Sequence, residues 1–106
     1  KNQSPKAPGI ISKAGIKTAI MTDHPCTPIQ YLPLCAAVAV KEGMDETEAL
    51  KAITINAAEI AGIADRVGSL EIGKDADIII MDAPPLELKS RVLCTIINGQ
   101  VVKKIC

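Results

Sequence analysis

The stretch Ala19-Ile20-Met21-Thr22-Asp23-His24-Pro25 decides how this chain is interpreted, because a short apolar run ends abruptly in an acid, an imidazole and a proline. Residues 16–22 are largely apolar and lack the clean alternation of a half-exposed strand, which is typical of a parallel strand covered on both faces. In α/β proteins, the carboxyl ends of such strands carry the chemistry. The stretch therefore predicts an α/β fold with Asp23 at the rim.

The composition predicts a small and incomplete core. The chain has 106 residues, of which 48% are apolar, but only one is a tyrosine and none is phenylalanine or tryptophan. A core without aromatic anchors buries less area per residue, and a chain of this length buries only ~60–65% of its unfolded surface. We therefore expect some apolar faces to pack against sequence outside this chain, which would make it a fragment of a larger protein.

The charge pattern excludes several classes of partner. Twelve basic and twelve acidic residues cancel, and neither sign is concentrated anywhere, so neither a nucleic-acid surface nor a basic membrane-binding helix is indicated. No apolar segment approaches the ~20 residues that span a bilayer. The four cysteines show no C-x-x-C spacing, which favours cytoplasmic thiols over a zinc knuckle or a disulfide framework. Neither nucleic acid nor a membrane is therefore expected as a partner.

Three short helices are expected after the strand, over about 31–42, 45–53 and 57–61. Asp45 and Asn56 stand at the start of the second and third helices, each with a glutamate three positions further on. An acid or amide followed by glutamate at this spacing is a capping pattern, because each side chain satisfies a free backbone N–H of the first turn. The pattern predicts Asp45 and Asn56 as N-caps.

The character of the chain changes near Arg66, which divides a βα part over 1–66 from an all-β part over 67–106. Glycines separate short extended pieces over 67–73, and a buried strand is expected soon after them. Asn98-Gly99 is the strongest short-range signal for a two-residue type I′ hairpin. The strands of this part are expected at 78–81, 92–97 and 100–102.

Asp23 has two interpretations from the residues alone. A carboxylate at the end of a buried strand can ligate a divalent ion and accept a proton from an attacking water. Alternatively, Asp23 starts an Asx turn, which the nearby Pro25 supports.

His24 is open in the same way, since an imidazole here either contacts metal or substrate or bonds a backbone group. Adjacent side chains of an extended chain point to opposite sides, so Asp23 and His24 are not expected on one ion. A separate zinc site of Asp23, His24 and Cys26 is disfavoured by its spacing and by the lack of a fourth ligand.

The run Gly73-Lys74-Asp75-Ala76-Asp77 resembles half of an EF-hand loop only superficially. The apolar residues 78–81 stand where the remaining calcium ligands would be, so a calcium site is rejected. A tight turn before a strand, with the Asp75 and Asp77 side chains accepting backbone N–H groups, accounts for the pattern.

Taken in order, four segments resemble the final third of amidohydrolase-superfamily enzymes, especially the imidazolonepropionase-like branch. Together they cover nearly the whole chain, and the third is the most specific because its glycines and acids all fall as in the family. One departure is Ala57, where the family usually has proline after the asparagine. The segments are AGIKTAIMTDHP at 14–25, ALKAITINAA at 49–58, GSLEIGKDADI at 68–78 and IINGQVV at 96–102.

The resemblance implies the last βα portion of a TIM-type (β/α)8 barrel, followed by C-terminal strands of a small β-sandwich that both ends of the chain build. Residues 16–22 would hold the last barrel strand, and 67–106 the sandwich strands. Asp23 would be the metal ligand and the general base in hydrolysis of an amide or cyclic C–N bond. The substrate of such an enzyme would be a small molecule, and His24 is the candidate residue to bind it. Zinc is the preferred ion, with iron the alternative.

The resemblance also implies that most metal ligands lie elsewhere, because the family's His-x-His pair, further histidines and carboxylated lysine have no counterpart among these residues. We expect this chain alone to be inactive, to hold no tightly bound metal and to self-associate through its uncovered apolar faces. The alternative is a small non-catalytic α/β interaction module. Its support is the short length and a complete-looking hairpin, and the lack of a recognisable groove or charge pattern stands against it.

Overall fold

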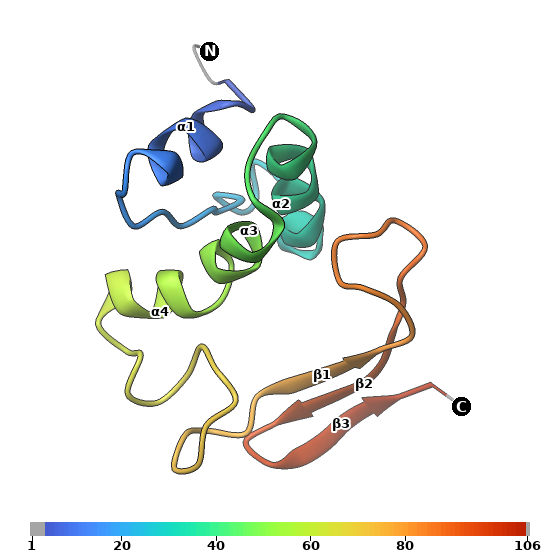
Figure 1. The fold of residues 1–106 in the computed structure, drawn as a ribbon. Coiled ribbons are helices and arrows are strands. Elements are labelled where there is room, and N and C mark those ends of the chain that lie inside the picture. The colour runs from blue at the N-terminus through green and yellow to red at the C-terminus, as the bar shows by residue number, and fades with distance from the viewer. Residues whose placement is uncertain (1–3, 106) are drawn as a thin grey trace.

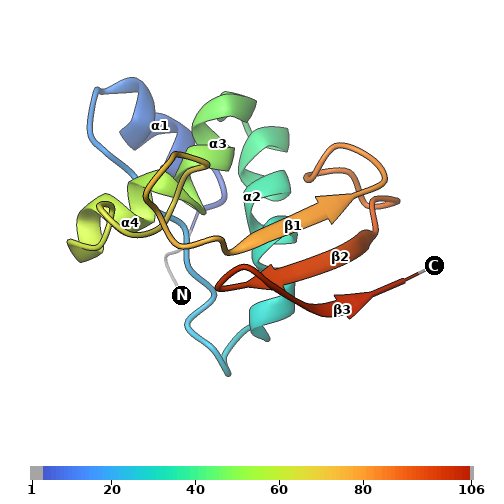
Figure 2. The ribbon, with the colours of Figure 1, turned by 90° about the horizontal axis from the view of Figure 1, so that it is seen from below.

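A computed structural model describes residues 4–105, in which a group of short helices precedes a three-stranded sheet (Figure 1). Seen from below, the sheet lies beside the helices rather than among them (Figure 2). None of the described helices is long and apolar enough to cross a membrane. The elements are α1 Ala7–Lys13, the 3-10 turn η1 Ile29–Tyr31, α2 Leu32–Lys41, α3 Glu46–Ala52, α4 Ile55–Ala61, β1 Ile78–Met81, β2 Val92–Ile97 and β3 Gln100–Lys104.

The expected helices are confirmed, with one correction to their caps. Asp45 is the N-cap of α3, and its carboxylate accepts a hydrogen bond from the Glu48 N–H at 3.2 Å. The third helix begins at Ile55 rather than near 57, so Asn56 lies inside it and Thr54 occupies the cap position. The prediction that Asn56 is an N-cap is therefore wrong. Its amide is needed elsewhere, because it bonds a segment that is distant in sequence.

Residues 16–22 do not form a strand, which corrects the main expectation for the first part of the chain. They run extended beside the helices without a strand partner among the described residues. Their backbone bonds α3 and α4 instead: the Ile20 N–H donates to the Ala52 carbonyl at 3.0 Å, and the Thr18 carbonyl accepts from the Asn56 side chain. A strand assignment requires a neighbouring strand, and the only sheet described lies in the other half of the chain.

The sheet is antiparallel, in the order β1-β2-β3, and confirms the three expected strands. Ile97 pairs with Gln100 across the tight turn, and Asn98 and Gly99 both have positive φ, at 51° and 78°. A type I′ turn requires this combination, so the hairpin prediction is confirmed. Two other expectations are wrong: residues 67–73 form bends and a turn without strand pairing, and β1 is only half-buried.

The buried core belongs to the helices. Four of its five buried members are alanines, which let α2 and α3 approach closely, and Met44 fills the remaining space. Leu86, from the loop between β1 and β2, packs against this cluster and ties the sheet to the helices. The buried members are Ala36, Ala39, Met44, Ala49 and Ala52.

Gly68 forms the second connection between helices and sheet. A Cβ added there would lie 2.8 Å from the Ala58 Cβ and 3.1 Å from the Ile55 Cα, so only glycine allows this approach to α4. Its φ of 102° lies in the region that side chains rarely adopt. Just beside it, Arg66 and Asp75 form an ion pair at 2.8 Å. The division of the chain near Arg66 stays a prediction.

Candidate functional site

Asp23 follows the extended segment directly and lies in a turn that its own backbone closes. The Asp23 carbonyl accepts a hydrogen bond from the Cys26 N–H at 2.8 Å, and the Thr22 carbonyl accepts from the Thr27 N–H at 3.3 Å. Asp23 has a φ of 55°, a left-handed conformation that aspartate tolerates better than most residues. Within residues 4–105, no hydrogen bond to its carboxylate is present, so the Asx-turn alternative is not what the structure shows.

His24 uses one ring nitrogen to hold this loop. Its Nδ1 accepts a hydrogen bond from the Ile29 N–H at 3.0 Å. In the neutral imidazole that this bond assigns, the proton is on Nε2, which is then a donor. Nδ1 is therefore occupied, and the group that His24 can offer to a ligand is a hydrogen-bond donor.

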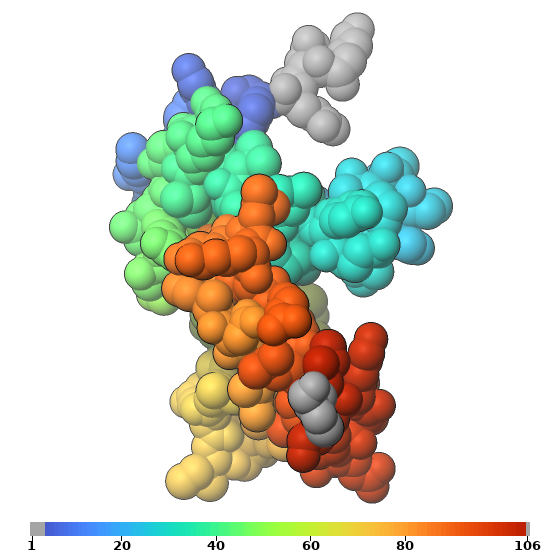
Figure 3. Space-filling model, turned by 90° about the vertical axis from the view of Figure 1, so that its right-hand side faces the viewer, coloured from blue at the N-terminus to red at the C-terminus, as the bar shows by residue number. Residues whose placement is uncertain are grey.

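Asp23 and His24 line the same open hollow, with a volume of about 340 Å³. Its other walls are mainly apolar and come from the extended segment and the start of α2. In the space-filling view, the light-blue and cyan part of the chain, which includes this loop, projects from the body of the molecule (Figure 3). The remaining lining residues are Ile20, Met21, Thr22, Ile29 and Leu32.

The donor set does not suffice for a metal centre. Across residues 4–105, no group of three or more histidine, cysteine or acidic side chains is arranged to hold an ion. Cys26 is exposed as a free thiol, while the Nδ1 of His24 already accepts a backbone bond. Asp23 is free to give one oxygen ligand. The structure thus brings Asp23 and His24 to one hollow but leaves the rest of an ion's coordination to other residues.

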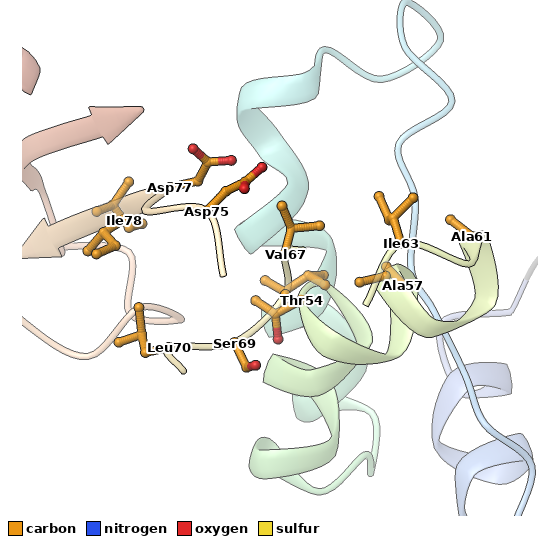
Figure 4. A pocket seen from close by; sticks show the side chains of 14 residues that line it. Thr54, Ala57, Ala61, Ile63, Val67, Ser69, Leu70, Asp75, Asp77 and Ile78 are labelled. Carbon is orange, nitrogen blue, oxygen red and sulfur yellow. The ribbon is translucent and has the colours of Figure 1, made fainter. Parts of the chain in front are cut away.

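A larger cavity of about 600 Å³ lies between α4, the turns over 67–70 and β1 (Figure 4). It is lined mostly by apolar side chains, and its two carboxylates are committed to structural bonds. Asp77 accepts a hydrogen bond from the Asn98 N–H at 2.9 Å, as the turn prediction required. Asp75 instead pairs with the Arg66 guanidinium, so the prediction of a backbone partner for it is wrong. This cavity is an apolar groove rather than a reaction centre.

Two perturbed acids both serve the fold. A hydrogen bond from Ser69, followed by contacts with Lys74, lowers the pKa of Glu71. Hydrogen bonds from the Arg91 backbone and side chain lower the pKa of Asp82. Both acids stabilise turns in the second half of the chain and neither lines the hollow beside Asp23, so neither is a candidate for the chemistry.

The residues that hold the Asp23 segment were not predicted from the sequence. Asn56 resembles a helix cap because of the glutamate three positions on, yet its side chain is buried and bonds Thr18. The available signal was the position of Asn56, a polar residue among the alanines of a short helix.

Comparisons with known proteins identify relatives of this chain in one enzyme family. The profile of the Amidohydrolase family matches residues 1–102. An imidazolonepropionase from Geobacillus kaustophilus is 46% identical over 74 residues, which cover 67% of this chain and 18% of that protein. An imidazolonepropionase from Fusobacterium nucleatum is 38% identical over 79 residues, covering 70% and 19% respectively.

A solved amidohydrolase from Thermotoga maritima superposes with a TM-score of 0.94 at 36% identity, covering 99% of this chain and 27% of the other. A 5-methylcytosine deaminase from Klebsiella pneumoniae superposes with a TM-score of 0.63 at 25% identity, over 91% of this chain and 27% of the other. The chain spans less than a fifth of the length of the two imidazolonepropionases. Because the family profile covers almost every residue, the chain belongs to the amidohydrolase family.

Proposed function

We propose that this chain is the C-terminal portion of a metal-dependent amidohydrolase that hydrolyses an amide or cyclic C–N bond, with Asp23 as the base. The observation that carries the proposal is the contrast between the backbone and the side chain of Asp23. Its backbone closes the turn after the extended segment, while no residue within 4–105 bonds its carboxylate, which lies at the edge of an open hollow. The relatives named imidazolonepropionase support a cyclic amide as the substrate.

The proposed architecture is the last βα portion of a (β/α)8 barrel followed by strands of a small β-sandwich. The similarity to the Thermotoga maritima amidohydrolase over 99% of this chain supports it. In this arrangement the segment 16–22 would gain the strand neighbours that it lacks here, and the half-buried sheet would gain a cover. Residues outside this chain would complete both parts.

In the mechanism, the Asp23 carboxylate accepts a proton from the attacking water and passes it to the leaving nitrogen. Asp23 would also give one oxygen ligand to a divalent ion, zinc preferred and iron the alternative. When bound, such an ion supplies acidity to the water and polarises the substrate carbonyl. The Nε2–H of His24 would donate a hydrogen bond to a substrate oxygen, since its Nδ1 is held by Ile29.

The isolated chain is proposed to be inactive, because a single free carboxylate does not retain an ion. A second candidate is a non-catalytic module that binds an apolar partner in the 600 Å³ groove beside α4. No such groove is predicted from the residues, so its presence in the structure supports this alternative. Loss of turnover on changing Asp23 would decide for the enzyme.

The test is Asp23→Asn in the native protein that contains these residues. Asparagine keeps the size and one ligating oxygen but cannot accept the proton, so turnover should fall on the order of 10²–10⁴-fold. Bound metal should fall only partly. Asp45→Asn is the matched control, because asparagine caps a helix as well as aspartate does. Turnover above about a tenth of wild type at full metal occupancy would show that Asp23 is not the base.

A further inference from the structure

Asn56 is the one buried polar residue of the described part of the chain, with 9% of its surface exposed. It is the second residue of α4, and its Nδ2 donates a hydrogen bond to the Thr18 carbonyl at 3.2 Å. Burying an amide is unfavourable unless its donors and acceptors are bonded. The bond to Thr18 therefore ties the position of α4 to the position of the extended segment.

Two more contacts attach the same segment to the same helices. The Ile20 N–H donates to the Ala52 carbonyl at the end of α3, at 3.0 Å. Lys17 and Glu59 form an ion pair at 2.7 Å, but both side chains are well exposed, so this pair contributes little. The Asn56 bond is the side-chain contact in this set that is partly buried.

The two hydrogen bonds also define a register. The Thr18 carbonyl and the Ile20 N–H are two residues apart, so in an extended chain they point to the same side. A slip of the segment by one residue would turn both groups away from α3 and α4. It would also move every following side chain to the opposite face. Both bonds hold the segment on the side of α3 and α4, shortly before Asp23.

We propose that Asn56 is a positioning residue that holds the segment carrying Asp23 against α4, and so aims the Asp23 carboxylate. The proposal rests on the proposed function for the role of Asp23, but not for the hydrogen bonds themselves. Asn56 touches neither the hollow nor any reacting atom in this arrangement. It acts through Thr18 and the segment that follows.

The test is Asn56→Asp in the native protein that contains this chain. Aspartate has the same shape, but its carboxylate cannot donate to the Thr18 carbonyl. Amide hydrogen exchange over residues 16–24 should then speed up on the order of 10-fold or more, because the segment opens locally. The kcat should fall on the order of 10- to 100-fold through misplacement of Asp23, with KM and metal content nearly unchanged.

Ala58→Gly is the matched control, because it weakens the same helix at a buried position without removing a bond to the segment. When Ala58→Gly lowers the melting temperature as much as the Asn56 variant does, amide exchange over 16–24 and kcat should still be close to the wild-type values. If Asn56→Asp does not fold, Asn56→Ala serves instead, since it removes the donor without adding a charge.

Exchange over 16–24 that is no faster in the Asn56 variant than in Ala58→Gly would overturn the proposal. Faster exchange with an unchanged kcat, in a protein that Asp23→Asn inactivates, would overturn the positioning role. If Asp23→Asn stays active, the proposed function fails, and the exchange comparison alone still decides whether Asn56 holds the segment.

Discussion

The helical region, from α1 to α4, and the sheet region, from β1 to β3, differ in how they use apolar residues. Every buried residue among those described lies between Gly9 and Ala58, and none lies in the sheet. Ile79 of β1 is 53% exposed although it stands in an unbroken apolar run, whereas Ala49 of α3 is fully buried. Helices with small side chains can cover one another, but a single three-stranded sheet cannot cover its own two faces.

A few contacts hold the two regions together. Leu86 reaches the helical core from the loop after β1, and Gly68 presses against α4. These contacts join a region that has its own core to one that does not. Apolar content alone therefore does not decide burial, because burial requires a second layer.

The two regions should differ most in how strongly the loss of a large apolar side chain lowers the free energy of unfolding. Met44→Ala removes the one large side chain of the helical core and should cost about 2–5 kcal/mol in the free energy of unfolding. Met81→Ala makes the same change in half-buried β1 and should cost about 1 kcal/mol or less. Urea unfolding of both variants measures the difference. Equal losses in the free energy of unfolding would show that the sheet region packs Met81 as tightly as the helical region packs Met44.

The next effect concerns the connection between the regions. Gly68→Ala places a methyl group against α4 and should be destabilising. Gly73→Ala is the control, because its φ of 93° is similar but nothing lies within 4 Å of the added Cβ. We expect Gly68→Ala to cost about 1–3 kcal/mol more than the control, from crowding alone. If the two variants unfold alike, the contact with α4 does not hold the regions together.

A smaller effect should appear in association. The exposed apolar side chains of the sheet should make the isolated chain self-associate and bind an apolar dye. The double variant Ile79→Thr, Val101→Thr should weaken both, while Ile10→Thr, at a helical site that is even more exposed, should change them less. Sedimentation and dye fluorescence measure this. A monodisperse monomer that binds no dye would contradict the idea that the sheet lacks its cover.

The smallest effect is a pH response of the loop between β1 and β2. Asp82 accepts hydrogen bonds from the Arg91 N–H at 2.7 Å and its Nε at 3.0 Å, which lower the pKa of Asp82 below its ordinary value of 3.8. Because the folded pKa is the lower one, the stabilisation is complete above pH 3.8 and is lost as pH falls through the folded pKa. The Arg91 amide resonance should shift in that acidic range. In Asp82→Asn this shift should vanish, and its persistence would assign it to another group.

Local signals in the sequence were sufficient for several elements. Asp45 caps α3 because its side chain meets the backbone only three residues away. Asn98-Gly99 makes the hairpin because two residues with positive φ satisfy the turn by themselves. Each prediction depended on chemistry within one turn of chain, and both are confirmed.

Signals that depend on distant partners were misread. The apolar run 16–22 was expected to form a strand, but no described strand lies beside it and it bonds the ends of α3 and α4. Asn56 carries the same local pattern as Asp45, but its amide bonds Thr18 across 38 residues. No short-range rule distinguishes a cap from such a contact.

The family, the short helices, the hairpin and the candidacy of Asp23 could all be inferred from the residues alone, because motifs and local hydrogen bonds depend on neighbouring residues. The folded arrangement was needed to show that no residue within 4–105 bonds the Asp23 carboxylate, that His24 Nδ1 accepts a backbone bond, and that Asn56 bonds Thr18. It also decided which apolar residues are buried. In each case, a hydrogen bond or a buried surface requires partner residues that are distant in sequence. These residues meet only after the chain has folded.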